Sequence, residues 1–309
     1  MINRNSSKFK SWISAARLRT IPLSVSGVLI GSFASNTSNN FNFLIFFLAI
    51  ATTISYQVLS NFANDYGDGI KGTDINRVGP KRAIQSGSIS IKEMKNGILT
   101  TSVISFFLTV LLVFESFKNS IISVILFLIL GILSIIAAIK YTVGNSPYGY
   151  LGLGDLFVFI FFGIISVLGS NFLFTSSFNA SLILPAVTIG LLSVGVLNLN
   201  NMRDIQNDTL AGKKTICVRI GLNNSKTYHV LLVLISMISM ISYLILQQKF
   251  SSFIIILILI NIIWLISDLK KVSRITEPKK FDLFLRPLVF ATVFYSLILS
   301  LNFAFLNYI

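Results

Sequence analysis

The chain has 309 residues, of which 54% are hydrophobic and only 12% are charged. Soluble globular proteins carry roughly 25% charged residues, so this composition excludes an ordinary soluble domain and indicates a membrane protein. The formal net charge of +14 would suit a nucleic-acid-binding protein, but the positions of the charges argue against that function.

Nine apolar stretches follow one another along the chain. Most of them approach the roughly 20 residues that a helix needs to cross a bilayer, and spanning backbone in lipid finds hydrogen-bond partners only within helices or closed barrels. We therefore expect an all-α protein, a polytopic membrane bundle of about nine transmembrane helices in a single domain, residues 1–309. The expected spans are residues 20–35, 42–61, 97–115, 120–139, 154–174, 181–199, 228–247, 251–267 and 286–307.

Basic residues lie almost entirely on one side of this expected bundle. With nine spans, 23 of the 25 Lys and Arg residues fall on the side of the N-terminus, and only Lys118 and Lys249 fall on the other. An excess of Lys and Arg marks the cytoplasmic side of a membrane protein. We therefore expect a bacterial plasma (inner) membrane protein whose basic N-terminal segment, residues 1–19, is cytoplasmic. The first span could also be read as a cleaved signal sequence. The charge bias argues against this, because removing that span would leave an even number of spans, which does not fit the distribution of Lys and Arg.

Carboxylates crowd the end of the second span, in the stretch NFANDYGDGIKGTD at residues 61–74. Residues three and four apart are neighbours on a helix, so we expect Asn61, Asn64 or Asp65, and Asp68 to share one face. The end of the sixth span repeats the pattern with Asn198, Asn201, Asp204 and Asp208. Each helix thus presents a strip of oxygen atoms at the same cytoplasmic end.

Two facing strips of this kind predict a site for a hard divalent cation. Mg²⁺ takes oxygen ligands and typically binds through one or two carboxylates together with substrate phosphates. Acidic side chains in a span are costly and usually face the bundle interior with a partner. We therefore expect Mg²⁺ and a diphosphate between the strips, with nearby bases as further counterions. The nearby bases are Lys71, Arg77, Lys81, Arg82, Lys140 and Arg203, and the candidate diphosphate-binding set among them is Lys71, Arg77, Lys140 and Arg203.

Other readings of these residues stay open at this point. Acidic residues at a span end are also common as solvated caps or loop charges. Intramembrane acids can mark the ion pathway of a transporter or channel, although here they gather at one surface. A metal-dependent lipid phosphatase would use the same diphosphate site.

The two aspartate-rich stretches resemble known motifs. NDYGD at 64–68 and RDIQND at 203–208 resemble the N-D-x-x-D and D-x-x-x-D motifs of the UbiA superfamily of intramembrane prenyltransferases. Four stretches are similar to its 1,4-dihydroxy-2-naphthoate branch: LSNFANDYGDGIKGTD at 59–74, RVGPKRAIQSGSIS at 77–90, YTVGNSPYGYLGLGDLFVFIFFG at 141–163 and LNLNNMRDIQNDTLAGKKT at 197–215. One departure is that many members carry a third aspartate where this chain has Gly72; the next acid is Asp74, whose role in metal binding stays open.

The resemblance implies a UbiA-like bundle with a central cavity. It also implies Mg²⁺-dependent transfer of a polyprenyl chain from its diphosphate to 1,4-dihydroxy-2-naphthoate, with loss of CO₂ and diphosphate, to give demethylmenaquinol for menaquinone biosynthesis. Another acceptor, 4-hydroxybenzoate or a carboxynaphthoquinone, is the alternative within the superfamily.

Specific side chains receive roles under this hypothesis. The expected catalytic and metal-binding set is Asn64, Asp65, Asp68, Asn201, Asp204 and Asp208. Aromatic faces attract cations, so Tyr141 and Tyr148 are expected to stabilise an allylic cation. Asp155 is expected either to orient the acceptor or to cap a helix. Asn61 and Asn198 complete the predicted acceptor-side set.

Overall fold

A computed structural model describes residues 2–38, 40–73, 82–247 and 250–305, and these residues form a helical bundle. The longer helices are α1 (Ile2–Ala16), α2 (Ile21–Ala34), α3 (Phe43–Lys71), α4 (Ile91–Ser116), α5 (Ile121–Lys140), α8 (Ile183–Leu210), α9 (Ile216–Gln247), α10 (Ser252–Val272) and α11 (Asp282–Phe305). The fifth span is composite, with α6 (Gly154–Val158), a π-helical segment (Phe159–Gly169) and α7 (Ser170–Thr175) in series. Short 3₁₀ turns lie at residues 18–20, 35–38, 148–151, 180–182 and 278–281.

Within these described residues, nine helical segments are long and apolar enough to cross a membrane. The predicted all-α class and number of spans are therefore confirmed. Several helices continue well beyond the apolar runs, so that α3 ends at Lys71 and α8 at Leu210. The basic segment before the first span is itself helical as α1, which packs on α3 through an edge-to-face contact of Trp12 with Phe62 at 5.2 Å.

Capping residues define the end of α3, which carries the first motif, and the start of α4, the next helix. α3 stops at Gly72, whose backbone is in the left-handed region (φ 67°), which glycine adopts without the penalty of a Cβ atom. α4 begins with a capping box in which Ser90 accepts a hydrogen bond from the Glu93 amide and Glu93 accepts one from the Ser90 amide.

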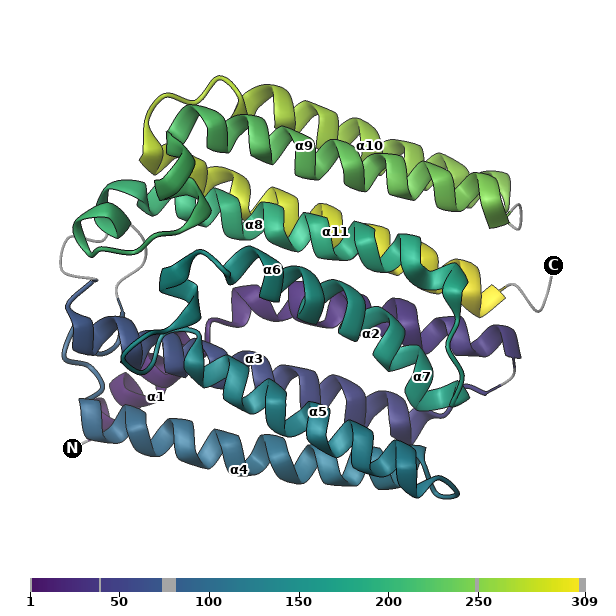
Figure 1. The fold of residues 1–309 in the computed structure, drawn as a ribbon, viewed down its shortest axis with the longest axis horizontal. Coiled ribbons are helices and arrows are strands. Elements are labelled where there is room, and N and C mark those ends of the chain that lie inside the picture. The colour runs from purple at the N-terminus through teal and green to yellow at the C-terminus, as the bar shows by residue number, and fades with distance from the viewer. Residues whose placement is uncertain (1, 39, 74–81, 248–249, 306–309) are drawn as a thin grey trace.

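The helices lie side by side in layers (Figure 1). α9 and α10 form one outer layer over α8 and α11, and α3, α4 and α5 form the opposite side, with α2 and the fifth span between them. Small residues let the middle layer pack closely: a Cβ on Gly31 would lie 2.2 Å from the carbonyl oxygen of Val167, and one on Gly163 would lie 2.7 Å from the Cα atom of Gly190. Close approach of this kind is typical of membrane helices.

Buried apolar residues form separate clusters on the two sides of the middle layer. The largest joins α8, α9, α10 and α11 with part of α2, and the smaller ones join α3 with α4 and α5 or with α1. α3, α8 and the start of α11 bring their ends to the same end of the bundle (Figure 1). The two halves enclose a cavity that both aspartate motifs line at this end.

Candidate active site

One large cavity of about 1030 Å³ runs through the bundle between its two halves. Its polar end is lined by both aspartate motifs, and its far part is lined by apolar side chains such as Leu112, Val113, Phe127 and Leu173. α2, α3, α5, the fifth span, α8 and α11 all contribute to the wall. The cavity therefore joins a charged chamber to a long apolar space, which suits an amphipathic ligand.

The first motif lies on the last turns of α3. Asn61, Asn64, Asp65 and Asp68 all line the cavity, as the helical spacing predicts. Asp65 is buried and accepts hydrogen bonds from the backbone amides of Ala83 (3.0 Å) and of the next residue (3.3 Å). This carboxylate thus holds the segment that precedes α4 against the site.

A loop packs closely on α3 between the two aspartates of this motif. A Cβ on Gly67 would lie 2.7 Å from the carbonyl oxygen of Thr142, so a larger residue would push the loop away. Thr142 also donates a hydrogen bond to the carbonyl oxygen of Ala63 (2.9 Å) and one to Asn64 Oδ1 (3.3 Å). The loop at residues 141–153 is thereby fixed to the helix that carries the motif.

Asp68 is the most highly contacted acid of the first motif. Its Oδ1 accepts a hydrogen bond from the Tyr150 hydroxyl (2.8 Å) and lies 2.9 Å from Lys213 Nζ. Its Oδ2 lies 3.6 Å from an Arg82 guanidinium nitrogen. The side chain is buried, so these contacts offset the cost of removing its charge from water.

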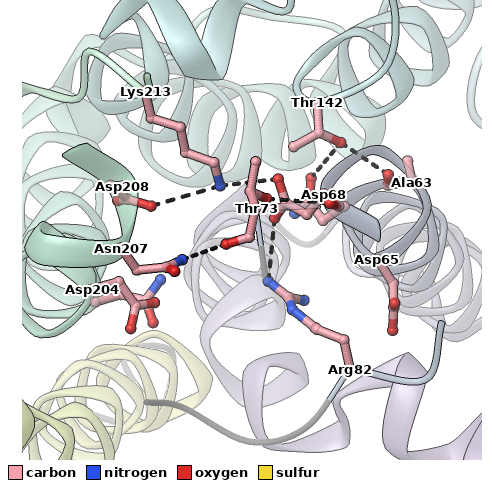
Figure 2. A network of polar contacts seen from close by, with 12 residues as sticks. Ala63, Asp65, Asp68, Thr73, Arg82, Thr142, Asp204, Asn207, Asp208 and Lys213 are labelled. Atoms are coloured by element: carbon pink, nitrogen blue, oxygen red, sulfur yellow. Dashed lines mark hydrogen bonds and ion pairs between the residues drawn. The ribbon is translucent and has the colours of Figure 1, made fainter. Parts of the chain in front are cut away.

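The second motif lies on the last turns of α8 and faces the first across the cavity. Asn201, Asp204 and Asp208 line the cavity, and all three are buried. Lys213 joins the motifs, because its Nζ lies 2.9 Å from Asp68 Oδ1 and 3.7 Å from Asp208 Oδ1 (Figure 2). A second link is the hydrogen bond from the Asn207 side chain to the carbonyl oxygen of Thr73.

The chamber between the motifs has the chemistry of a cation site. Carboxylate and amide oxygens from both helices line it, and the ammonium group of Lys213 already occupies a position between two of the acids. Among the described residues, no three His, Cys, Asp or Glu side chains come close enough together to hold a metal ion. A divalent cation would therefore take part of its coordination from substrate oxygens and water, as Mg²⁺ usually does.

None of the predicted diphosphate-binding bases that the structure describes lines the cavity. Lys71 and Lys140 are exposed near the motif end of the bundle, and neither is part of the cavity lining of the described chain. Lys71 Nζ lies 4.2 Å from the centre of the Tyr150 ring. Arg203 is buried, is not part of the cavity lining and pairs with Asp204. Arg77 lies outside the residues that the structure describes, as does Asp74.

Of the two bases that line the chamber, Arg82 belongs to the wider group of nearby bases named from the sequence, whereas Lys213 does not. Lys213 and Arg82 both contact Asp68 and both line the cavity. Lys213 follows Asp208 by five residues in the stretch LAGKKT, and this proximity to the motif was the available signal. Tyr150, which also contacts Asp68, had no comparable signal, because only the tertiary fold brings its loop to α3.

Tyr141 and Tyr148, the tyrosines predicted to stabilise a cation, form an aromatic wall beside the charged chamber. Both line the cavity, with ring centres 5.3 Å apart, and Tyr148 stacks on Phe157 at 4.0 Å. The Tyr148 hydroxyl donates to the carbonyl oxygen of Ala137 (2.8 Å), which fixes its ring. Burial raises the pKa of both phenols above the ordinary tyrosine value, and the Asp155 charge adds to the rise at Tyr141, so both side chains are neutral.

The other predicted acceptor residues make structural contacts. Asn61 lines the cavity but donates to the carbonyl oxygen of Ala16 (2.8 Å), which ties α3 to the end of α1. Asn198 donates to the carbonyl oxygen of Ser225 (3.0 Å) and lies outside the cavity lining of the described chain.

Asp155 is buried in the first turn of α6. It accepts a hydrogen bond from the Tyr228 hydroxyl (3.0 Å), and it too lies outside the described lining. It is not the N-cap of α6, a position held by Leu153, so the expected capping role is not met.

The chain matches the UbiA prenyltransferase family over residues 24–299. It is 44% identical over 246 residues to a Haemophilus influenzae protein named 1,4-dihydroxy-2-naphthoate octaprenyltransferase, and the match covers 79% of each chain. An Escherichia coli protein of the same name is 43% identical over 239 residues, with 77% of each chain covered.

A solved structure shows the same fold. It is a UbiA homologue from Archaeoglobus fulgidus bound to DMAPP and Mg²⁺, with a TM-score of 0.68 at 13% identity, covering 97% of this chain and 100% of that one. The fold, the family match and the two bacterial relatives agree with one another. The chain therefore belongs to the UbiA prenyltransferase family, as a multi-pass membrane enzyme in the branch of its 1,4-dihydroxy-2-naphthoate relatives.

Proposed function

We propose that this protein transfers a polyprenyl chain from a polyprenyl diphosphate to 1,4-dihydroxy-2-naphthoate, which yields demethylmenaquinol, diphosphate and CO₂. The observation that carries the proposal is the cavity, which has both aspartate motifs at one end, aromatic rings beside them and an apolar space beyond. The names of the two bacterial relatives supply the aromatic acceptor. The charge asymmetry supports a motif end that faces the cytoplasm of a bacterial inner membrane.

The polar end of the cavity would bind the diphosphate. The donor set fits Mg²⁺, which would be held by the motif residues Asn64, Asp65, Asp68, Asn201, Asp204 and Asp208 together with phosphate oxygens. When bound, Mg²⁺ supplies Lewis-acid stabilisation of the negative charge on the leaving diphosphate. Lys213 and Arg82, whose cationic groups line the same chamber, add further positive charge beside the leaving group.

The aromatic wall would stabilise the allylic fragment as the C–O bond breaks. Tyr141, Tyr148 and Phe157 all line the cavity, and a ring face attracts a cation by about 0.5–2 kcal/mol. The apolar residues that line the rest of the cavity exclude water and receive the prenyl tail. The carbocation is thereby protected from hydrolysis until the acceptor reacts.

The acceptor step balances without a net proton transfer. The ring carbon that bears the carboxylate forms the new C–C bond to the prenyl chain. The electron pair of the bond to the carboxylate then returns to the ring as CO₂ leaves, which restores aromaticity. The chemistry therefore demands no general base, and the cavity residues need only bind and orient the naphthoate.

Purified protein in nanodiscs would test the proposal. A polyprenyl diphosphate and Mg²⁺ are supplied, and dihydroxynaphthoate and 4-hydroxybenzoate are offered in parallel, with and without EDTA. We expect a product with the mass of naphthoate plus prenyl minus CO₂, formed only without EDTA. Prenylated hydroxybenzoate as the only product would refute the naphthoate acceptor. Release of phosphate with neither acceptor consumed would instead favour a lipid phosphatase.

A further inference from the structure

Arg203 is a fully buried cation in the span that carries the second motif. Its side chain is 0% exposed and lies one residue before Asp204 on α8. A charged group at such a position is costly unless partners satisfy it, so an ionisable residue buried within a span is a candidate for function. The groups that satisfy the Arg203 charge are Asp204, Asp282 and Asn200.

The guanidinium group of Arg203 grips Asp204 with two hydrogen bonds. Nε donates to Asp204 Oδ1 at 2.8 Å and one terminal nitrogen donates to Oδ2 at 2.6 Å. This bidentate geometry fixes the plane of a carboxylate as well as its position. Asp204 lines the cavity, whereas Arg203 lies outside the lining formed by the described residues, so the base supports the acid from behind.

Two further side chains hold the guanidinium group itself. The second terminal nitrogen of Arg203 donates to Oδ1 of Asp282, the first residue of α11, and the nitrogen that contacts Asp204 also donates to Asn200 Oδ1 at 2.6 Å. The Asp282 side chain is 44% exposed and lines the cavity. Two carboxylates therefore surround one buried cation, and the cluster has a net charge of −1.

We propose that Arg203, anchored by Asp282, is a positioning residue that holds Asp204 in the orientation needed to bind a divalent cation and diphosphate. The inference rests on the proposed function of Asp204. It replaces the predicted role of Arg203 as a direct diphosphate ligand. Removing a group that orients a metal ligand typically lowers metal affinity by about 10-fold to 100-fold.

Binding of Mn²⁺ in the presence of inorganic pyrophosphate tests this without any turnover. The purified full chain in nanodiscs is titrated with Mn²⁺, and free Mn²⁺ is measured by electron paramagnetic resonance. We expect Arg203→Lys, which keeps the charge but loses the fork, and Asp282→Asn, which neutralises the cluster, to weaken Mn²⁺ binding by about 10-fold or more. Glu277→Gln, at an exposed acid five residues before Asp282, is the matched control.

A double substitution separates positioning from a direct contact. Interacting groups give non-additive effects, so Asp282→Asn should add little once Asp204→Asn is present. An equal loss in both backgrounds, or no loss from Asp282→Asn alone, would overturn the inference. If the unaltered protein binds no Mn²⁺ with pyrophosphate, or binds it equally well with Asp204→Asn, the proposed function of the motif fails instead. Because Asp282 is half-exposed, its variant keeps the test valid even if Arg203→Lys does not fold.

Discussion

The hydrogen bond from Tyr150 to Asp68 offers a sharp test of the site. Tyr150→Phe removes the hydroxyl that lies 2.8 Å from Asp68 Oδ1 and keeps the ring over which Lys71 and Lys213 lie. A hydrogen bond to a charged group contributes about 1.5–3 kcal/mol, which corresponds to roughly 10-fold to 150-fold. Lys213 and Arg82 still contact Asp68, so we expect the lower part of that range, about 10-fold to 30-fold.

The assay is prenyl transfer at several Mg²⁺ concentrations, with kcat/KM measured for the donor. We expect kcat/KM to fall and the Mg²⁺ concentration for half-maximal activity to rise, because Asp68 is less firmly oriented. Tyr66→Phe is the matched control, since Tyr66 packs in the apolar cluster around Phe62 and Met94. A Tyr150→Phe enzyme within twofold of the unaltered protein at every Mg²⁺ concentration would refute the role given to this contact.

Three further predictions follow from the same geometry. Asp65→Ala and Asp204→Ala should each lower prenyl transfer by about 100-fold or more, because metal stabilisation of a leaving group contributes several kcal/mol. Both variants should still insert into the membrane. Near-normal product formation by either would contradict the paired-motif site. Tyr148→Leu should lower kcat by roughly 2-fold to 30-fold with little change in donor KM, and Tyr148→Phe should be close to normal; a change in KM alone would show that the ring only binds. Gly67→Ala should reduce stability by about 1–3 kcal/mol, because its Cβ would lie 2.7 Å from a backbone carbonyl oxygen. Thermal unfolding in detergent measures this loss, with Gly169→Ala, whose nearest atom is 3.6 Å away, as the control that should be unchanged.

Helical geometry explains why Asn198, predicted as an acceptor-side residue, lies outside the described lining. At 3.6 residues per turn, Asn201, Asp204 and Asp208 fall within an arc of about 60° on α8, whereas Asn198 lies about 120° from Asp204. The structure agrees with these angles: Asn201, Asp204 and Asp208 line the cavity, whereas Asn198 donates a hydrogen bond to the carbonyl oxygen of Ser225 on α9. On α3 the four predicted residues span only about 100°, and all of them line the cavity.

Helical angles do not predict which bases contact the acids. Arg203 precedes Asp204 by one residue, so it starts about 100° away around α8, and its long side chain curls back to the carboxylate rather than into the cavity. Lys213 lies in a loop and Tyr150 in a short 3₁₀ turn, so no helical periodicity assigns a direction to either side chain. Their approach to Asp68 depends on how the loop at 141–153 and the segment after α8 pack on each other, as in the hydrogen bond from the Lys214 amide to the Tyr150 carbonyl oxygen.

The sequence by itself determined the helical class, the number of spans and the acids that line the cavity. Lipid permits few backbone conformations, so apolar length specifies a spanning helix, and an acid in such a helix is costly and usually faces the bundle interior with a partner. The tertiary structure alone decided which bases reach those acids and which aromatic rings stand beside them. These contacts join α3, α8 and two loops that are far apart in the chain, and their distances depend on packing rather than on any local pattern.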